Sequence, residues 1–234
     1  MKDWVEASKQ YVLNGLAAKE SWRLFRILAE FVDGFEELPK VFPAVTIFGS
    51  TRVREGHPYY EKAEAIARLL GQEGFSVITG GGPGIMEAAN KGAADVGAYS
   101  VGLNIKLPHE QEPNPYANVR LEFRYFFVRK VMMVKYAVAF ICLPGGFGTL
   151  DEFFEAVTLV QTHKIRPIPI VLVEQEYWKG LIAWIKGRLL AEKMIFRKDL
   201  ELFAVLDEPE EVVRYIKEKT KIYSRDFCRY EATR

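Results

Sequence analysis

The sequence predicts an α/β protein built on a parallel β-sheet with helices packed on both of its faces. From about residue 43, short apolar runs that suit buried strands alternate with longer stretches that suit helices. The strand candidates are apolar almost throughout, which is typical of parallel strands covered on both sides. Two of them run directly into glycine-rich turns that open helices. Together these observations favour a doubly wound, Rossmann-like sheet.

Six apolar segments are predicted as strands, and helices are predicted between most of them. The strand candidates are Val45–Ser50, Phe75–Thr79, Ser100–Ile105, Val119–Phe126, Val138–Leu143 and Ile168–Val173. The helix candidates are Pro58–Gly74, Gly84–Gly97, Val128–Tyr136, Thr149–Lys164 and Tyr177–Leu190. A last helix is expected from about Pro209, with the side chain of Asp207 as its cap. The proline-rich stretch Leu107–Asn118 is predicted to be a loop close to the ligand.

The chain is predicted to form a single domain over residues 1–234. Residues 1–40 form an N-terminal helical extension, because apolar residues recur there at helical spacing. Asn14-Gly15 is expected to divide this extension and Gly34 to end its second helix. Residues 43–220 form the predicted ligand-binding α/β core, and residues 221–234 form a polar tail.

The strongest functional signal is the stretch Leu143–Glu152, which reads Leu-Pro-Gly-Gly-Phe-Gly-Thr-Leu-Asp-Glu. A buried strand here enters a glycine turn that opens a helix. Such a turn directs several backbone N–H groups and the positive end of a helix dipole at one place, where a phosphate binds well. Thr149 adds a hydroxyl group, and Asp151 and Glu152 add carboxylates that can serve as an acid or a base.

A second stretch repeats this layout. The strand candidate Phe75–Thr79 runs into Gly80-Gly81-Gly82-Pro83-Gly84, and a helix with Glu87 in its first turn follows. One glycine turn is a weak signal, because many loops need a residue at positive φ. Two with the same layout favour a phosphate site. Both turns, and Gly49-Ser50, fall at predicted carboxyl ends of strands, where such sheets bind ligands; Ser50 is either a hydrogen-bonding ligand residue or a plain turn residue.

Composition narrows the class of protein. The chain has 234 residues, of which 49% are hydrophobic, and this is enough for the core of one large domain. The net charge of +1 gives no electrostatic reason to expect nucleic acid or a membrane as a main partner. No apolar run approaches the ~20 residues that a membrane-spanning helix needs.

The two cysteines suggest no disulfide framework. Cys142 lies in an apolar run and is predicted to be a small core residue, and Cys228 lies in the polar tail. No Cys-x-x-Cys pair and no signal peptide are visible, so we expect a reducing cytoplasm.

Several nucleotide and metal motifs are absent. No Gly-x-Gly-x-x-Gly is followed by an acidic residue about 20 positions later, and no Gly-Lys-Ser/Thr closes either turn. The histidines His57, His109 and His163 lack metal-ligand spacing. No lysine stands out as a Schiff-base residue for pyridoxal phosphate. We therefore predict neither a cofactor nor a bound metal.

Three segments of the chain resemble motifs of the Lonely Guy (LOG) family, in the order that the family has them. Pro144–Glu152 matches its Pro-Gly-Gly-x-Gly-Thr-x-x-Glu signature, and Gly80–Asn90 resembles the glycine motif of its longer bacterial branch. Phe126–Lys130 resembles the segment with the family's Arg-Lys pair. The resemblance spans roughly residues 44–190. Many members carry the label lysine decarboxylase, which these residues do not support.

The resemblance implies a phosphoribohydrolase, an enzyme that cleaves the N-glycosidic bond of a nucleoside 5′-monophosphate to a free base and ribose 5-phosphate. The substrate would be AMP-like or a cytokinin riboside monophosphate. Arg129 and Glu152 correspond to the family's proposed catalytic pair. Lys130 is assigned to the substrate site, or else it pairs with a carboxylate. Asp151 stands where many members have Glu.

The resemblance also implies a set of substrate-binding residues. The phosphate-holding turn corresponds to Gly145, Gly146, Gly148 and Thr149. The first glycine motif, where members line the ribose pocket, includes Gly81, Gly82, Glu87 and Asn90. Ser50 corresponds to a serine near the base.

The implied chemistry suits these residue types. N-glycosidic cleavage passes through an oxocarbenium-like sugar, as glycoside hydrolysis does. A carboxylate at Glu152 would stabilise that positive charge or activate water, and Arg129 would orient Glu152 or the substrate. The structural alternatives are compensation of a helix dipole by Glu152 and a surface ion pair for Arg129.

The sequence is compatible with two other functions. The same phosphate site would serve a non-hydrolytic carrier or sensor of a nucleotide or phospho-cofactor, or an enzyme acting on another phosphorylated small molecule. The family commonly dimerises, so a homodimer or a higher homo-oligomer is expected. Tyr125, Phe126, Phe127, Met132 and Met133 are candidates for the subunit contact, with core packing as the alternative.

Overall fold

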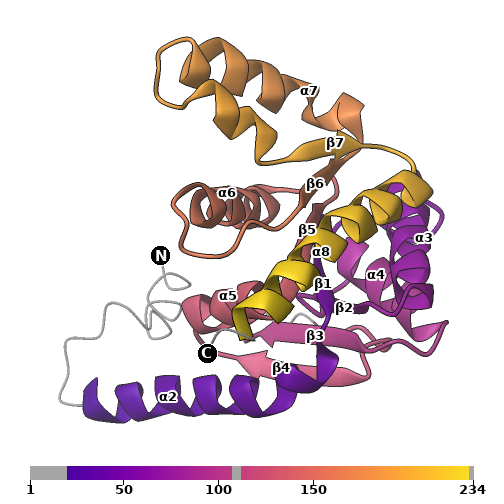
Figure 1. Cartoon of the computed structure of the whole chain (residues 1–234). Coiled ribbons are helices and arrows are strands. Elements are labelled where there is room, and N and C mark those ends of the chain that lie inside the picture. The colour runs from indigo at the N-terminus through magenta and orange to yellow at the C-terminus, as the bar shows by residue number, and fades with distance from the viewer. Residues whose placement is uncertain (1–19, 107–111, 232–234) are drawn as a thin grey trace, which may run out of the picture.

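The computed structural model describes residues 20–106 and 112–231, which are arranged around one seven-stranded sheet (Figure 1). The strands are β1 (Ala44–Phe48), β2 (Ser76–Thr79), β3 (Ser100–Ile105), β4 (Val119–Phe123), β5 (Ala137–Cys142), β6 (Ile170–Val173) and β7 (Ala204–Leu206). Their order in the sheet is β4-β3-β2-β1-β5-β6-β7, and every neighbouring pair is parallel. The predicted doubly wound α/β fold is therefore confirmed.

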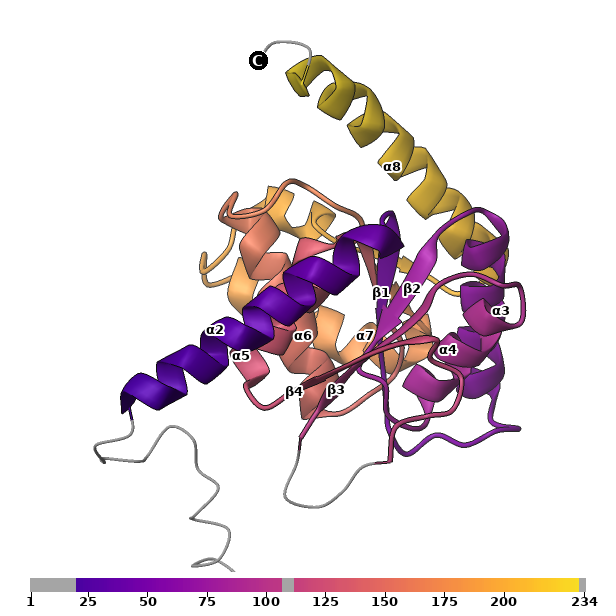
Figure 2. The ribbon, with the colours of Figure 1, turned by 90° about the horizontal axis from the view of Figure 1, so that it is seen from below.

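Helices cover both faces of the sheet (Figures 1 and 2). The long helices are α2 (Glu20–Glu37), α3 (Pro58–Gln72), α4 (Ile85–Ala94), α5 (Phe126–Lys135), α6 (Phe147–Gln161), α7 (Gln175–Trp184) and α8 (Pro209–Glu231). The short helical segments are η1 (Leu38–Val41), η2 (Ile185–Leu190) and η3 (Arg197–Glu201). Apolar side chains of α3, α4 and α8 form the core on one face, and those of α2, α5, α6 and α7 form the core on the other.

The side chains of strand β1 contribute alternately to the cores on the two faces of the sheet. All of its residues are buried, and successive side chains point to opposite faces. Val45 and Ile47 pack under α3 and α4, and Ala44 and Phe48 pack on the side of α5 and α6. The hydroxyl of Thr46 donates to the carbonyl of Met133 at 2.9 Å, so that even this buried polar group is satisfied.

Part of the stretch predicted as a subunit contact belongs to the core of this chain. Tyr125, Met132 and Met133 are buried in the cluster beneath α5, while Phe126 and Phe127 are exposed. Tyr125, Met132 and Met133 are therefore core residues, and of these five residues only Phe126 and Phe127 remain available to a partner.

Helix α2 does not end at Gly34, as the sequence suggested, but continues to Glu37. Gly34 is buried where α2 crosses α5, and a β-carbon at this position would lie 2.5 Å from Sδ of Met132. The glycine therefore serves close helix packing rather than termination. The first predicted helical piece, before Asn14-Gly15, lies outside the described residues.

The predicted strand Val119–Phe126 is too long, because β4 ends at Phe123 and α5 begins at Phe126. The buried carboxylate of Glu30, on α2, accepts hydrogen bonds from the backbone N–H groups of Arg124 and Tyr125, at 2.9 and 3.3 Å. These two groups are thereby turned away from the sheet, and the chain enters the helix.

Asp207 caps a different helix from the one predicted. Its Oδ1 accepts hydrogen bonds from the N–H groups of Glu174 and Gln175, at 3.1 and 2.7 Å, at the start of α7. The first N–H groups of a helix lack partners within it, so this carboxylate satisfies two of them. Strand β7, which directly precedes Asp207, was not predicted because it has only three residues. Helix α8 runs across the predicted boundary at residue 221 to Glu231.

No helix in the described ranges is both long enough and apolar enough to cross a membrane. The strand order places β1 between β2 and β5, and the chain reverses its direction of winding at this point. A doubly wound sheet opens a crevice at such a switch point, beyond the carboxyl ends of the strands.

Candidate active site

The two glycine turns lie next to each other at the switch point, and the backbone of Ser50 joins them. The N–H group of Ser50 donates to the carbonyl of Pro144, and the carbonyl of Ser50 accepts from the N–H group of Ile85, each at 3.0 Å. Ile85 opens α4 after the first turn, and Pro144 precedes the second. The loop after β1 therefore holds both turns in one crevice.

Close contact between these loops requires a glycine at position 84. Gly84 has φ +75°, and a β-carbon there would lie 2.4 Å from the carbonyl oxygen of Ser50. Any side chain would push the first turn away from the loop after β1. The Oγ atom of Ser50 accepts from the N–H group of Arg52 at 3.1 Å, which is the turn role considered for this residue. Contact between Ser50 and a ligand stays a prediction.

The second glycine turn opens helix α6 towards solvent. Gly146 is the N-cap of α6, and Gly146–Gly148 are exposed, so the unpaired N–H groups in the first helical turn of α6 lie at the surface. The helix dipole adds a partial positive charge there, and an anion is stabilised. Thr149 is buried, and its hydroxyl lies directly beneath Gly145, where a β-carbon would come within 2.1 Å of it. The geometry is that of a phosphate cradle.

Tyr177 braces this cradle from helix α7. Its hydroxyl donates to the carbonyl of Gly145 at 2.6 Å, which fixes the turn just before α6. No sequence signal singled out Tyr177, because it lies outside the glycine motifs and is one of many aromatic residues in the chain.

Glu152 lies one turn into α6, with only 7% of its surface exposed. Burial raises the pKa of Glu152 to about 7, against the opposing influence of the cations Lys130 and Arg129. A carboxyl group with a pKa near neutrality can exchange protons at the pH of a cell. Compensation of the helix dipole alone would need neither this burial nor this pKa.

Lys130 is held by three carboxylates rather than left free for a phosphate. Its Nζ lies 2.7 Å from Asp151, 2.8 Å from Glu155 and 3.8 Å from Glu152. Burial works to lower the pKa of Lys130, but the hydrogen bonds to Asp151 and Glu155 outweigh it and raise the pKa. Lys130 therefore pairs with carboxylates, as the second interpretation of the sequence predicted. The structure does not support a direct contact between Lys130 and the substrate.

Arg129 lies between the first glycine turn and Glu152. A β-carbon on Gly80 would lie 3.7 Å from an Arg129 guanidinium nitrogen, and the guanidinium interacts electrostatically with Glu152. It also lies over the ring of Phe126, at 5.6 Å from the centroid. Burial lowers the pKa of Arg129, although an arginine stays charged. Its Nε is buried and has no hydrogen-bond partner, so the surface ion pair considered as the alternative is not what the structure shows.

The first glycine turn is covered by protein. Gly81 and Gly82 are buried, and the N–H group of Gly81 already donates to the hydroxyl of Thr79 at 3.0 Å. Glu87 is half-buried, and one of its oxygens accepts from the Tyr60 hydroxyl at 3.3 Å. This turn therefore forms a wall of the crevice and offers fewer free donors than the turn at α6.

Asn90 was predicted to contact the ligand, and the structure does not support this. Its side chain has no exposed surface, and both of its amide atoms are engaged. Asn90 Oδ1 accepts from Thr79 and Asn114, and Nδ2 donates to Ser100 and Val101. Asn90 supports the first turn from inside the protein.

Cys142 is the core residue that the sequence predicted. It is fully buried at the end of β5, and burial, followed by the nearby charge of Glu152, raises the pKa of its thiol. A thiol of this kind is unreactive.

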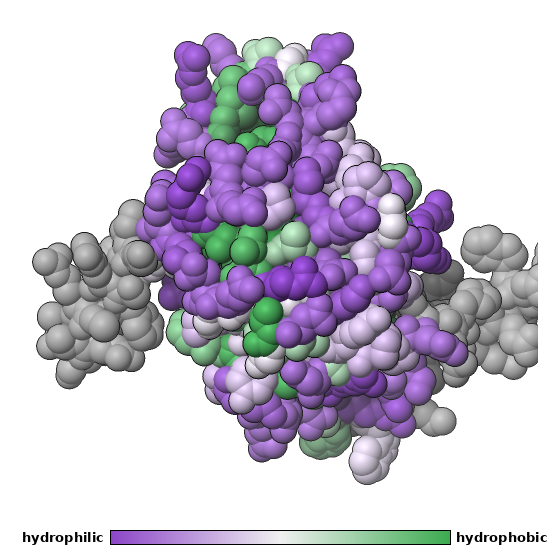
Figure 3. Space-filling view, turned by 90° about the vertical axis from the view of Figure 1, so that its right-hand side faces the viewer, coloured by the Kyte–Doolittle hydropathy of each residue, from purple (hydrophilic) through white to green (hydrophobic). Residues whose placement is uncertain are grey.

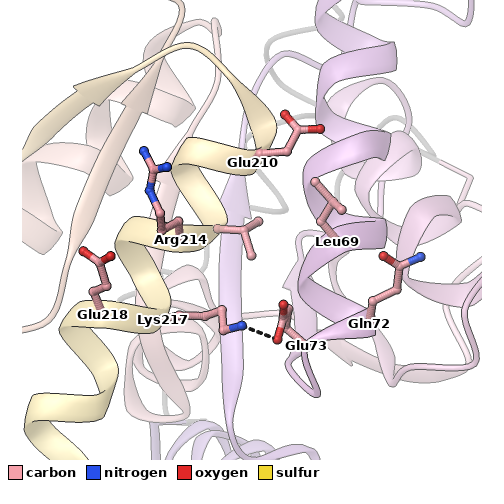
Figure 4. Close-up of a pocket in the computed structure, with 8 residues that line it drawn as sticks. Leu69, Gln72, Glu73, Glu210, Arg214, Lys217 and Glu218 are labelled. Atoms are coloured by element: carbon pink, nitrogen blue, oxygen red, sulfur yellow. Dashed lines mark ion pairs between the residues drawn. The ribbon is translucent and has the colours of Figure 1, made fainter.

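A cavity of about 300 Å³ elsewhere in the molecule lies between α3 and α8 (Figure 4). Its lining residues include Leu69, Gln72, Glu73, Glu210, Arg214, Lys217 and Glu218. Nζ of Lys217 pairs with Glu73 at 2.5 Å across it. Because α3 ends just before β2 begins, this cavity lies towards the amino ends of the strands and is separate from the crevice.

The fold and the crevice define a class: a doubly wound α/β protein in which the exposed N-terminus of a helix lies beside a buried carboxyl group and a half-buried arginine. Comparisons agree with this class. A family model described as "Possible lysine decarboxylase" matches residues 86–216.

Two curated relatives bear names of the same kind. The chain is 31% identical over 159 residues to cytokinin riboside 5′-monophosphate phosphoribohydrolase from Mycobacterium tuberculosis, covering 66% of this chain and 83% of that protein. It is 33% identical over 134 residues to the rice (Oryza sativa) enzyme LOG, covering 55% of this chain and 54%, about half, of that protein's length. The chain belongs to this family, the LOG family.

A solved structure shows the same fold. The molybdenum cofactor binding protein from Rippkaea orientalis aligns with 75% of this chain and 94% of its own, with a TM-score of 0.54 and 20% identity. At this identity the likeness concerns the fold alone.

Proposed function

We propose that this protein hydrolyses the N-glycosidic bond of a nucleoside 5′-monophosphate, releasing the free base and ribose 5-phosphate. The observation that carries the proposal is the presence, beside an open helix terminus, of a buried carboxyl group together with a half-buried arginine whose buried Nε lacks a hydrogen-bond partner. A simple phosphate-binding site would use the arginine but has no need of the buried carboxyl group.

The residues suggest a division of labour. The N–H groups at Gly146–Thr149 hold the phosphate, and the sugar extends from it along α6 towards Glu152. The bond from C1′ to the base nitrogen breaks, and its electron pair leaves with the base, which takes up a proton. Ionised Glu152 stabilises the positive charge on the sugar or takes a proton from the water that adds its hydroxyl group to C1′. Arg129 binds the substrate through the donors that the protein leaves unpaired.

The substrate class follows from the relatives, whose names specify cytokinin riboside monophosphates. AMP-like nucleotides share the sugar phosphate that the cradle would hold. The direct test is to incubate the pure protein with AMP and other nucleoside monophosphates, including a cytokinin riboside monophosphate, and to measure free base by chromatography. We expect release from at least one of them. Tight binding with intact nucleotide recovered after long incubation would instead favour a binding or carrier protein, and the name of the Rippkaea orientalis protein specifies cofactor binding.

Lys130 provides a second test, because it is the closest cation to Glu152 and helps to keep the carboxyl group ionised. Lys130→Met should move the acidic limb of the pH profile of base release about one unit to higher pH, since an opposite charge within ~4–6 Å lowers a carboxyl pKa by one to three units. Lys135→Met is the matched control, because Lys135 lies on the same helix over the rings of Phe35 and Tyr136. A profile unchanged by Lys130→Met would contradict the assigned role of Glu152.

We further propose that the protein forms a homodimer through the side that carries α2, α5 and α6. Helix α5 exposes Phe126, Phe127 and Val131. Helix α2 exposes Trp22, Phe25, Leu28, Val32 and Phe35. A groove of about 580 Å³, lined in part by Val134 and Leu159, lies between α5 and α6. The side on which α3 and α4 lie is mainly hydrophilic, with apolar residues only in separate patches (Figure 3). Contiguous exposed apolar surface is typical of a protein interface.

The dimer is tested by light scattering after size-exclusion chromatography. The protein should elute as a dimer, and Val131→Glu should shift it to the monomer by placing a charge in the contact. Met194→Glu is the control, because Met194 is 68% exposed and lies away from α2, α5 and α6 in sequence and fold. A monomer in the unmodified protein would rule out this contact.

A further inference from the structure

Asn114 lies outside both glycine turns and the Phe126–Lys130 segment, and it fastens the first glycine turn. Its backbone N–H group donates to the carbonyl of Gly81 at 2.9 Å, and its Nδ2 donates to the carbonyl of Gly82 at 3.0 Å. The same Nδ2 donates to Oδ1 of Asn90 at 2.9 Å, and Oδ1 of Asn114 accepts from the N–H group of Tyr116. With 3% of its surface exposed, Asn114 uses every polar group of its side chain inside the protein.

A second asparagine acts on the same turn. Nδ2 of Asn104, on β3, donates to the carbonyl of Gly81 at 3.2 Å. Gly81 has φ +70°, and a β-carbon there would lie 2.3 Å from Oδ1 of Asn104. The turn can therefore adopt this shape only with glycine at 81, and the two asparagines bind the carbonyl groups that the shape directs into the protein.

The turn that these asparagines hold forms the wall beside Arg129. Gly80 begins the turn, and a β-carbon at this position would lie 2.7 Å from Sδ of Met86 and 3.7 Å from a guanidinium nitrogen of Arg129. The buried Nε of Arg129 has no hydrogen-bond partner in the protein, so no hydrogen bond from this atom fixes the direction of the guanidinium. A shift of the turn would open space next to the guanidinium and allow it to leave the crevice.

We propose that Asn114 is a positioning residue, which holds the first glycine turn so that Arg129 is directed at the bound nucleotide. This inference rests on the proposed function for the identity of the ligand. Asn114 itself does not touch the ligand in this scheme. It acts through the turn on Arg129, and this distinguishes it from a residue that only stabilises the fold.

The test is a double-mutant cycle with Arg129, measured as the affinity for AMP by calorimetry and as kcat and KM for base release. When Arg129 is present, Asn114→Ala should weaken AMP binding or lower kcat/KM about tenfold. In the Arg129→Ala background the same substitution should change these values less than twofold. Asn118→Ala is the matched control, because Asn118 also bonds two backbone groups, Ser100 N–H and Ala98 C=O, but at the start of β3. It should leave both values within twofold.

Equal losses in both Arg129 backgrounds would overturn the inference, because a purely structural residue acts independently of Arg129. Asn114→Asp repeats the test with an isosteric side chain that cannot donate to Gly82, in case the alanine variant does not fold. If the unmodified protein binds AMP without hydrolysing it, the affinity cycle still decides the role of Asn114 while the proposed function fails. If it neither binds nor hydrolyses any nucleotide, both are wrong.

Discussion

Replacement of Glu152 by Gln is expected to lower kcat for base release by about 10²–10⁴, the range for loss of a general base or a charge-stabilising group. The variant keeps the shape of the side chain and removes only its charge and its basicity. Glu155→Gln is the matched control, because Glu155 lies about one turn later on α6 and also pairs with Lys130, at 2.8 Å. The control should retain most of the activity. Full activity in Glu152→Gln would remove this carboxylate from the mechanism.

The pH dependence tests the same residue. Because burial raises the pKa of Glu152 to about 7, the carboxyl group is mostly protonated at pH 6 and mostly ionised at pH 8. The ionised form is the active one, so kcat/KM should rise with pH and level off above about pH 8. A profile that falls across this range would assign Glu152 the role of a general acid and contradict the proposed one.

The stability of the same variant should change in the opposite direction to its activity. A carboxyl group whose pKa is raised in the folded state favours folding most below its unfolded pKa of about 4.5, and this contribution is lost as the pH rises through 7. At pH 8 the folded protein bears the cost of a buried charge that Gln removes. At pH 8 the free energy of unfolding of Glu152→Gln should therefore be about 1–3 kcal/mol higher than that of the unmodified protein, and this difference should vanish near pH 4.5. Thermal melts at the two pH values measure this.

Arg129→Ala is expected to lower kcat/KM by about 10²–10³, the loss seen when one preorganised donor is removed from a reacting centre. The reason is the half-buried guanidinium near Glu152, whose Nε makes no hydrogen bond within the protein and which we assign to the substrate. Arg129→Lys should recover only part of the loss, because an ammonium group keeps the charge but lacks the planar set of donors.

Kinetics of the arginine variants should be measured with AMP and with inorganic phosphate as a competitor. Arg124→Ala is the control, since Arg124 is an exposed arginine just before the same helix. The melting temperature of Arg129→Ala should not fall markedly, because no hydrogen bond of Nε is lost. An Arg129→Ala enzyme that is unfolded or fully active would contradict the assignment.

The sequence was sufficient for the fold class and for locating the two glycine turns at the carboxyl ends of strands. Alternation of apolar strands with helices predicted the doubly wound sheet, and the place where the ligand binds stays a prediction from the two turns. The order of the strands, which brings the turns together through Ser50, depends on long-range pairing and could not be read from local patterns. Single glycines and carboxylates were harder to interpret. Gly34 and Asp207 looked like a helix terminator and a cap, but their roles depend on Met132 and on α7, which are distant in sequence.

The same limit applies within the site. Arg129 and Glu152 were singled out from motifs, but the burial that raises the pKa of Glu152 could only come from the packed structure. Lys130 and Asn90 have polar side chains within motifs and were assigned to the ligand, whereas the structure engages them with carboxylates and with buried backbone. Asn114 and Tyr177 lie outside the motifs, and only the folded chain shows that they bind the carbonyl groups of the glycine turns.

The most direct test of the site is a crystal structure of the Glu152→Gln variant with AMP bound. The phosphate should lie against the N–H groups of Gly146–Thr149, and C1′ of the ribose should lie within about 4 Å of the side chain at 152, close to the near-attack distance. Arg129 should donate to the nucleotide. A phosphate bound elsewhere, or a ribose directed away from residue 152, would show that this crevice does not cleave nucleotides.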